Sequence, residues 1–198
     1  MKLDFQAKFL QHLNKKKKPD EGFTLIELLV VIIIIGILAA IALPSLLSQV
    51  NKGKQAEAKQ NIGAVNRAQQ AYFLENDSFA SDVVSVGIGI KTQTVNYNYT
   101  IKANETQNQA GDTVYDKTNN IASARATTLK SYVGQNFTTF GDTTVSEVLT
   151  LGFVCESNNI GTQGSADAEG AAYAEDQATG CDTSLFKDLS GTKKGSGA

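Results

Sequence analysis

The chain has 198 residues, a formal net charge of −2 and two cysteines, which allows one ordinary domain and an additional segment. Residues 1–22 carry six lysines and three acids, so the remaining sequence carries 12 basic and 17 acidic groups. This excess of acids excludes a large nucleic-acid-binding surface, because such a surface clusters Lys and Arg against phosphates.

A long apolar run follows the lysines of residues 15–18. It has no polar side chain between Leu28 and Leu43, and as a helix residues 23–43 would be about 32 Å long, close to the roughly 30 Å of a bilayer core. The lysines should stay on the cytoplasmic side. A secretory signal peptide is disfavoured because its apolar region has roughly 7–15 residues. A membrane anchor, or a cleaved leader followed by a helix stored in the membrane, both remain open.

The stretch GFTLIE at residues 22–27 resembles the processing site of type IV prepilins and related pseudopilins. Gly36 and Pro44 are placed as in many pilins, and residues 61–80 look most like cyanobacterial major pilins. The resemblance covers about the first 80 residues. One departure is the leader, which at 22 residues is longer than the shortest pilin leaders. It implies that a membrane-embedded peptidase cuts after Gly22 and methylates the new amino group of Phe23.

Glu27 is an acid in a segment that a bilayer would accommodate poorly. An acid at the centre of a membrane helix costs about 2.5–3.5 kcal/mol, and such residues usually have a partner. Glu27 can cap its own helix, where the dipole favours an anion by roughly 0.3–1 kcal/mol. The resemblance implies instead that Glu27 pairs with the Phe23 amine of a neighbouring subunit and sets the axial register, and this is the hypothesis we adopt.

Two residues weaken the apolar helix. Gly36 lowers helix propensity by about 1 kcal/mol and Pro44 by about 3 kcal/mol. They predict either a simple kink, which membrane helices tolerate, or the loss of helical order that resemblance to assembled pilins implies for residues 36–44.

An amphipathic pattern continues the helix through residues 48–76, with turn formers expected to end it near Glu75, Asn76 and Asp77. We therefore expect residues 23–47 to form a transmembrane and filament-core half, and residues 48–76 to pack on a head domain. The apolar stripe of the second half consists of Leu47, Val50, Ala58, Ile62, Val65, Ala68 and Tyr72.

The head, residues 77–198, is predicted to be β-rich. Residues 94–101 and 148–155 alternate apolar and polar side chains, and residues 131–140 form a weaker candidate because of Gly134. One face should carry Val95, Tyr97, Tyr99 and Ile101, and another Leu149, Leu151, Phe153 and Cys155. Gly-Asp pairs at 111–112 and 141–142 suggest turns, and residues 77–93 are expected to form the αβ-loop. The expected fold class is α+β, a long N-terminal helix with a small antiparallel sheet, and the resemblance to pilins implies the type IV pilin fold.

Cys155 and Cys181 lie in the last quarter of the chain. A bridge between them would close a 27-residue loop and contribute about 3.5 kcal/mol in the chain-entropy model. It would form only outside the cytosol; two unlinked thiols are the alternative. Resemblance to pilins suggests that this loop is the D-region, a surface patch for adhesion or subunit contacts.

The acids near this loop are weak candidates for a metal site. Their spacing fits no EF-hand, so a solvated acidic loop without metal is expected. They are Asp167, Glu169, Glu175, Asp176 and Asp182.

Catalysis is poorly supported. The only histidine, His12, lies in the expected leader, which leaves no Ser-His-Asp or Cys-His arrangement, no Walker loop and no indicated cofactor. We therefore interpret the chain as a structural subunit and not as an enzyme.

The function that the resemblance implies is that of a pilin which polymerises with itself into a surface pilus for motility, adhesion or DNA uptake. Its partners would be the prepilin peptidase and methyltransferase, an assembly platform with ATPases, and the inner membrane, with the head outside the cytoplasm. The alternatives are a pseudopilin of a type II secretion system and a membrane-anchored binding protein that never polymerises. Pseudopilins often lack the disulfide loop, so the cysteines favour a pilin.

Overall fold

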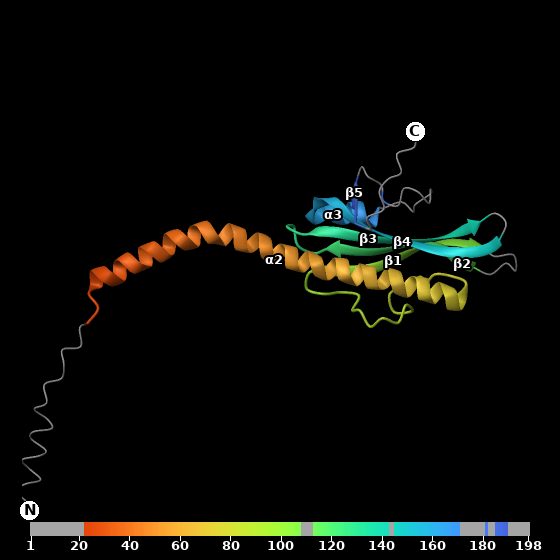
Figure 1. Ribbon diagram of the computed structural model, residues 1–198, viewed down its shortest axis with the longest axis horizontal. Helices are drawn as coiled ribbons and strands as arrows, with labels where there is room; N and C mark the ends of the chain where they lie inside the picture. The colour runs from red at the N-terminus through yellow and green to blue at the C-terminus, as the bar shows by residue number, and fades with distance from the viewer. Residues whose placement is uncertain (1–21, 108–112, 143–144, 171–180, 182–184, 190–198) are drawn as a thin grey trace, which may run out of the picture. The chain divides into compact units, whose positions relative to one another are not determined.

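The computed structural model describes residues 22–107, 113–142, 145–170, 181 and 185–189. The chain divides into two compact units, Met1–Leu47 and Ser48–Ala198, and the long helix α2 contributes to both. The elements in chain order are α2 (Leu25–Asn76), β1 (Tyr97–Gln107), β2 (Thr113–Ala124), β3 (Lys130–Asp142), β4 (Val145–Ile160), α3 (Gly161–Glu169) and β5 (Phe186–Asp188) (Figure 1).

The first unit is the start of α2. Leu, Ile, Val and Ala side chains cover its whole circumference, and every described residue of this unit is exposed. A helix that is apolar on all sides is stable only in lipid or against other apolar surfaces. By length and composition, α2 is the one helix among the described residues that could cross a membrane. It continues through Gly36 and Pro44 without interruption.

The second unit contains a five-stranded sheet in the order β1-β2-β3-β4-β5. Every neighbouring pair is antiparallel, so the sheet is a meander of consecutive strands. The later part of α2 lies along one face (Figure 1), and α3 contacts β2, β3 and β4. The long helix with an antiparallel sheet confirms the predicted α+β fold.

The face toward α2 holds an apolar cluster and a close helix–sheet contact. A Cβ atom on Gly134 would lie 2.1 Å from Asn66 Oδ1 and 2.7 Å from Ile62 Cγ2. Glycine is therefore required on β3 to let the helix approach this closely. The buried cluster consists of Ala58, Ile62, Val83, Tyr97, Tyr99, Ala122, Leu129 and Tyr132.

Buried amides form a second layer of contacts at this interface. Asn66 donates from Nδ2 to the carbonyl oxygen of Phe153 at 2.8 Å and accepts at Oδ1 from Asn120 at 2.8 Å. Asn136 Nδ2 donates to the backbone oxygen of Asn66 at 2.8 Å. Gln69 forms two bonds with the backbone of Ala80, one to its oxygen at 2.9 Å and one from its nitrogen at 2.8 Å. These contacts fix the helix on the sheet.

The opposite face of the sheet has its own core beneath α3. Phe137 and Phe153 stack with ring centroids 5.7 Å apart. The disulfide between Cys155 and Cys181, with a Cα–Cα distance of 5.8 Å, lies in the same cluster and confirms the predicted bridge. The remaining buried members are Ile121, Val133, Ala168 and Phe186.

Several strand predictions need correction. β1 starts at Tyr97, so Val95 precedes it and is 87% exposed instead of buried. Leu149 and Leu151 lie on the predicted face of β4 but are partly exposed, at 42% and 37%. The turn expected at 111–112 lies outside the described residues, and residues 141–142 are the end of β3.

The helix ends where the turn formers predicted, but its buried stripe begins later than expected. α2 ends at Asn76, and Asp77 follows with a φ of 52°, a conformation that breaks a helix. Leu47 and Val50 are exposed, so the buried stripe begins only at Ala58. Residues 77–93 contain no regular helix or strand.

Candidate processing and assembly site

The expected cleavage site lies immediately before helix α2. Gly22 and Phe23 have no regular secondary structure, and the Phe23 side chain is 76% exposed. A Cβ atom on Gly22 would meet nothing within 4 Å in this chain, so the glycine is not needed for its packing here.

Thr24 and Glu27 form a capping box at the start of α2. The backbone nitrogen of Thr24 donates to Glu27 Oε2 at 2.9 Å, and the Thr24 hydroxyl donates to the same oxygen at 2.7 Å. The backbone nitrogen of Glu27 in turn donates to Thr24 Oγ1 at 3.3 Å. A Thr-x-x-Glu sequence caps a helix in this reciprocal manner. In the isolated chain, Glu27 therefore stabilises the first turn of its own helix.

An open apolar surface surrounds Glu27. Phe23, Ile26, Val30 and Val31 line a shallow hollow beside the carboxylate. These four side chains are between 42% and 76% exposed. Such a surface is suited to contact with lipid or with an equally apolar helix. The Glu27 carboxylate of the capping box lies beside it.

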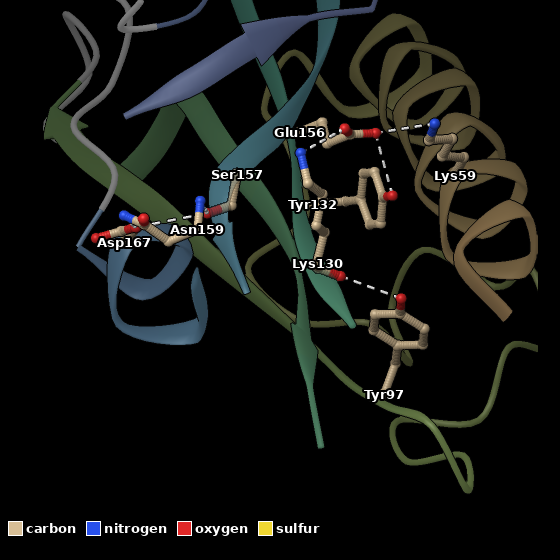
Figure 2. Close-up of polar contacts among 8 residues, drawn as sticks. All are labelled: Lys59, Tyr97, Lys130, Tyr132, Glu156, Ser157, Asn159 and Asp167. Atoms are coloured by element: carbon tan, nitrogen blue, oxygen red, sulfur yellow. Dashed lines mark hydrogen bonds and ion pairs between the residues drawn. The ribbon is translucent and has the colours of Figure 1, made fainter. Parts of the chain in front are cut away.

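A cluster of charged side chains connects α2 to the sheet. Figure 2 shows Glu156 of β4 between Lys59 of α2 and Lys130 of β3, and each ammonium nitrogen lies 2.9 Å from a Glu156 oxygen. The Tyr132 hydroxyl donates to Glu156 Oε2 at 3.2 Å, and Lys59 Nζ lies 5.5 Å from the centroid of the Tyr132 ring. Tyr97 donates to the Lys130 carbonyl oxygen at 3.1 Å. We call Lys59, Lys130, Tyr132 and Glu156 the Glu156 cluster.

The ionisation states in the Glu156 cluster follow from burial and charge. Burial acts to raise the pKa of Glu156, but hydrogen bonds from Lys59 and Lys130 together outweigh it, so the pKa is lowered. Burial raises the pKa of Tyr132 and of Tyr97. At neutral pH Glu156 is therefore a carboxylate, and both tyrosines are protonated donors.

The expectation that Asp167 belongs to a solvated acidic loop was wrong, because this residue lies in helix α3. Its side chain is buried and accepts hydrogen bonds from Asn159 at 2.9 Å and from Ser157 at 3.4 Å (Figure 2). It also accepts a bond from Gln163 at 2.9 Å. The bonds from Asn159 and Gln163 lower its pKa.

The other acids near the disulfide form no recognisable metal site. Glu169 is exposed and accepts from Ser123 at 2.9 Å. Glu175, Asp176 and Asp182 lie outside the described residues. Within the described ranges, no three His, Cys, Asp or Glu side chains gather as metal ligands do.

Sequence reasoning placed the processing motif but missed the polar interface of the head. Lys59 is not part of the predicted apolar stripe, and nothing in the pattern around Cys155 indicated that Glu156 would meet two lysines. The buried amides of Asn66 and Gln69 gave one usable signal, because they occupy helix positions adjacent to the apolar stripe of Ile62 and Val65.

Comparisons with known proteins agree with these features. Residues 55–181 match the family described as type IV pilin-like G and H, and residues 17–43 match the prokaryotic N-terminal methylation motif. No solved structure matches the chain.

Curated relatives match over limited stretches. The chain is 46% identical over 68 residues to the type IV major pilin protein PilA of Myxococcus xanthus, covering 34% of this chain and 31% of that protein. It is 36% identical over 81 residues to the type II secretion system core protein G of Pseudomonas aeruginosa, covering 41% and 57%. It is 34% identical over 82 residues to the type IV wide pilus major component of Thermus thermophilus, covering 41% and 63%.

The chain thus spans from about a third to less than two thirds of the length of these relatives. The family match covers more than half of the sequence, including residues 55–76 of α2, strands β1 to β4 and both cysteines of the disulfide. The chain therefore belongs to the type IV pilin-like G and H family.

Proposed function

We propose that this chain is the structural subunit of a type IV pilus and polymerises with copies of itself. One observation carries the proposal: residues 25–47 of α2 form a helix that is apolar on every side and has Glu27 as its single charge. A family of structural, non-enzymatic proteins and a methylation motif at the helix start support the same function.

Processing precedes assembly in this proposal. A prepilin peptidase removes residues 1–22 by cutting after Gly22, and the exposed position of Gly22 and Phe23 supports its access. The same enzyme then methylates the amino group of Phe23. Before assembly the chain is held in the inner membrane by residues 23–47, with the leader in the cytoplasm and the head outside.

Assembly exchanges lipid for protein around α2. Because an unpaired charge in an apolar environment is strongly disfavoured, Glu27 pairs with the Phe23 amine of a neighbouring subunit and sets the axial register. Residues 36–44 lose helical order in the filament and let it stretch. An assembly platform and partner ATPases supply the energy.

The head presents the outer surface of the filament. Residues 48–76 pack on it, residues 77–93 form its αβ-loop, and the D-region between Cys155 and Cys181 contacts other subunits or external surfaces. Likeness to a major pilin and to a wide pilus major component supports a major subunit. Motility, adhesion and DNA uptake are the activities of such a fibre. The resemblance of residues 61–80 to cyanobacterial major pilins is in keeping with this role.

A pseudopilin of a type II secretion system is the second candidate, supported by the likeness to core protein G. The disulfide favours the pilus, because many pseudopilins lack such a loop. Surface material sheared from cells and weighed as intact protein distinguishes the two. We expect long fibres whose subunit starts at N-methylated Phe23 and keeps the disulfide. A subunit absent from the fibres, or one that starts at Met1, would refute the proposal.

A further inference from the structure

A tight turn at residues 94–97 leads into strand β1 and exposes one apolar side chain. The Thr94 nitrogen donates to the Tyr97 oxygen at 2.8 Å, and the Tyr97 nitrogen donates to Thr94 Oγ1 at 3.1 Å. Just outside the turn, the Tyr99 nitrogen donates to the Thr92 oxygen at 2.7 Å. Val95 lies inside this fixed turn and is 87% exposed. We call residues 94–97 the Val95 turn.

Arg125 holds the Val95 turn through neutral partners. Its Nη1 donates to the Thr94 oxygen at 2.8 Å, and its backbone nitrogen donates to the Asn96 oxygen at 2.9 Å. Both acceptors are uncharged carbonyl groups, and in the described part of the chain the basic residues that form ion pairs are Lys59 and Lys130. Arg125 and Lys91 are both exposed, and with Val95 they line a shallow hollow. An exposed apolar side chain thus lies beside two cations.

The Val95 turn lies at the end of the head where α2 enters it. Asn96 Nδ2 donates to Glu57 Oε2 at 3.2 Å, and farther along both elements Asn61 Nδ2 donates to the Tyr99 hydroxyl at 2.9 Å. β1 therefore runs in the same direction as α2, away from the Val95 turn. Glu57 comes nine residues after Ser48, where the second unit begins, which is about 14 Å along a helix.

Basic residues gather in the three segments that meet at this end. Tyr97 at the start of β1 pairs with Ala124 at the end of β2, so residues 91–98 and 122–129 lie together, and residues 48–56 lead into the same end along α2. These segments contain no acid, and their basic residues are Lys52, Lys54, Lys91 and Arg125. The remaining residues of 48–198 contain eight basic residues and 16 acids. This end is therefore positive although the head as a whole is acidic.

The combination of cations and an exposed valine suits an anionic lipid surface. A single exposed apolar residue is ordinary, but attachment to a membrane interface scales with buried apolar area together with attraction of cations to anionic lipids. The stems of Lys91 and Arg125 can lie against lipid while their charges stay at the headgroups.

The distance from the bilayer allows this contact. The headgroup layer is roughly 5–8 Å thick on each side of the hydrocarbon core, and electrostatic attraction extends about 8 Å farther at physiological ionic strength. Together these lengths equal the spacing of about 14 Å from Ser48, which directly follows the apolar segment, to Glu57 beside the turn.

We propose that the Val95 turn and the cations Lys52, Lys54, Lys91 and Arg125 dock the head on the anionic lipid headgroups of the membrane that holds α2. The inference rests on the membrane step of the proposed function. Docking holds the head against the bilayer before assembly, and it must be released when the subunit leaves the lipid.

Fluorescence of the full chain in lipid vesicles tests the docking. The sequence contains no tryptophan, so V95W introduces a single indole at the turn. V84W is the matched control, because Val84 is 78% exposed and its nitrogen donates to the carboxylate of Asp82. The vesicles contain phosphatidylcholine and phosphatidylglycerol, and some of the phosphatidylcholine carries a nitroxide on its headgroup, which quenches a nearby indole. Both leaflets contain the nitroxide, so either orientation of the chain is reported.

We expect the nitroxide to quench V95W strongly and V84W weakly. Replacing phosphatidylglycerol with phosphatidylcholine should bring V95W to the level of V84W. Salt at about 1 M should do the same, because the Debye length is then about 3 Å. Adding K91Q to V95W should lower the ratio of docked to free heads about fivefold, because each basic residue near an anionic surface strengthens attachment by about that factor.

Equal quenching of V95W and V84W, or quenching of V95W that does not depend on phosphatidylglycerol, would overturn the proposal. A blue-shifted V95W emission without quenching would overturn it too, because it shows that protein, such as a second copy, covers the turn.

Flotation with the vesicles separates this inference from the pilus proposal. A chain that floats with an unquenched V95W indole overturns the docking alone, whereas a chain that does not float refutes the membrane step on which both depend. Strong quenching of V95W together with the absence of the chain from surface fibres would support the docking and refute the pilus.

Discussion

Replacing Glu156 with Gln tests how much the Glu156 cluster contributes to holding α2 on the sheet. The change keeps the size of the side chain but removes the charge that Lys59 and Lys130 share at 2.9 Å each. Hydrogen bonds to charged groups contribute about 1.5–3 kcal/mol, whereas a buried partner left unpaired costs about 3–5 kcal/mol. Lys59 and Lys130 are 41% and 27% exposed and can turn toward water, so the smaller value applies.

We expect Glu156→Gln to lower the free energy of unfolding by about 2 kcal/mol. For a chain of this size the melting temperature should fall by about 4–8 °C. Thermal unfolding of the full chain in detergent, followed by circular dichroism, measures the change. Glu105→Gln is the matched control, because Glu105 is exposed, and a substitution there should stay within about 0.5 kcal/mol.

The pH dependence gives the same prediction a second test. The pKa of Glu156 lies below its ordinary value of 4.5 in the folded chain. The stability that the carboxylate contributes is therefore fully present above pH 4.5 and is lost as the pH falls through the lower, folded value. The difference between the parent and Glu156→Gln should shrink in that acidic range. A difference no larger than that of Glu105→Gln at neutral pH, or one unchanged at low pH, would refute the reasoning.

Three further predictions follow from the packing of the head, each measured as a denaturant midpoint. Gly134→Ala should destabilise by about 1–3 kcal/mol because of overpacking, since its Cβ would lie 2.1 Å from Asn66 Oδ1; Gly53→Ala, which meets nothing within 4 Å, should not destabilise. Replacing Cys155 and Cys181 together with Ser should cost about 3.5 kcal/mol, and reductant should then have no further effect. Gln69→Leu should cost about 2–4 kcal/mol, because it leaves two buried backbone groups of Ala80 unpaired; a loss below 1 kcal/mol would show that water replaces the amide.

The helix and the processing motif could be predicted from sequence because both depend on local pattern. The apolar run is continuous, and Thr24 and Glu27 have the spacing of a capping box. The alternation at Tyr97 and Tyr99 likewise identified β1, because these side chains alternate with exposed polar ones.

Strand β2 was missed because its buried residues are polar. Thr118, Asn119 and Asn120 are each 1% exposed or less, and Asn120 is accommodated by bonds to Asn66 and Gln69 of the distant helix. No local pattern shows that such partners exist. Helix α3 was missed for a related reason, because its small Gly, Ala and Ser residues form no apolar stripe and are held by packing on the sheet.

The exposure of Leu149 and Leu151 also could not be predicted from the alternation of apolar and polar residues. A period of two shows which side chains share a face, but not whether another element covers that face. The Glu156 cluster required the same long-range information, since Lys59 is far from Glu156 in sequence.

The central claim is that Glu27 acts between subunits, and not only as a cap of its own helix. Two variants separate these roles. Glu27→Gln removes the charge but keeps a residue that can complete a capping box. Thr24→Val removes the capping hydroxyl, which bonds to Glu27 at 2.7 Å, and leaves the charge.

The direct measurement is the yield of sheared filaments from cells that make equal amounts of each variant. Glu27→Gln leaves the Phe23 amine of the neighbouring subunit without its partner. An unpaired charge costs about 2.5–3.5 kcal/mol in the apolar core, so this variant should lower the filament yield on the order of a hundredfold. Thr24→Val should stay near the parent yield. Normal filaments from Glu27→Gln, or an equal loss from Thr24→Val, would contradict the claim.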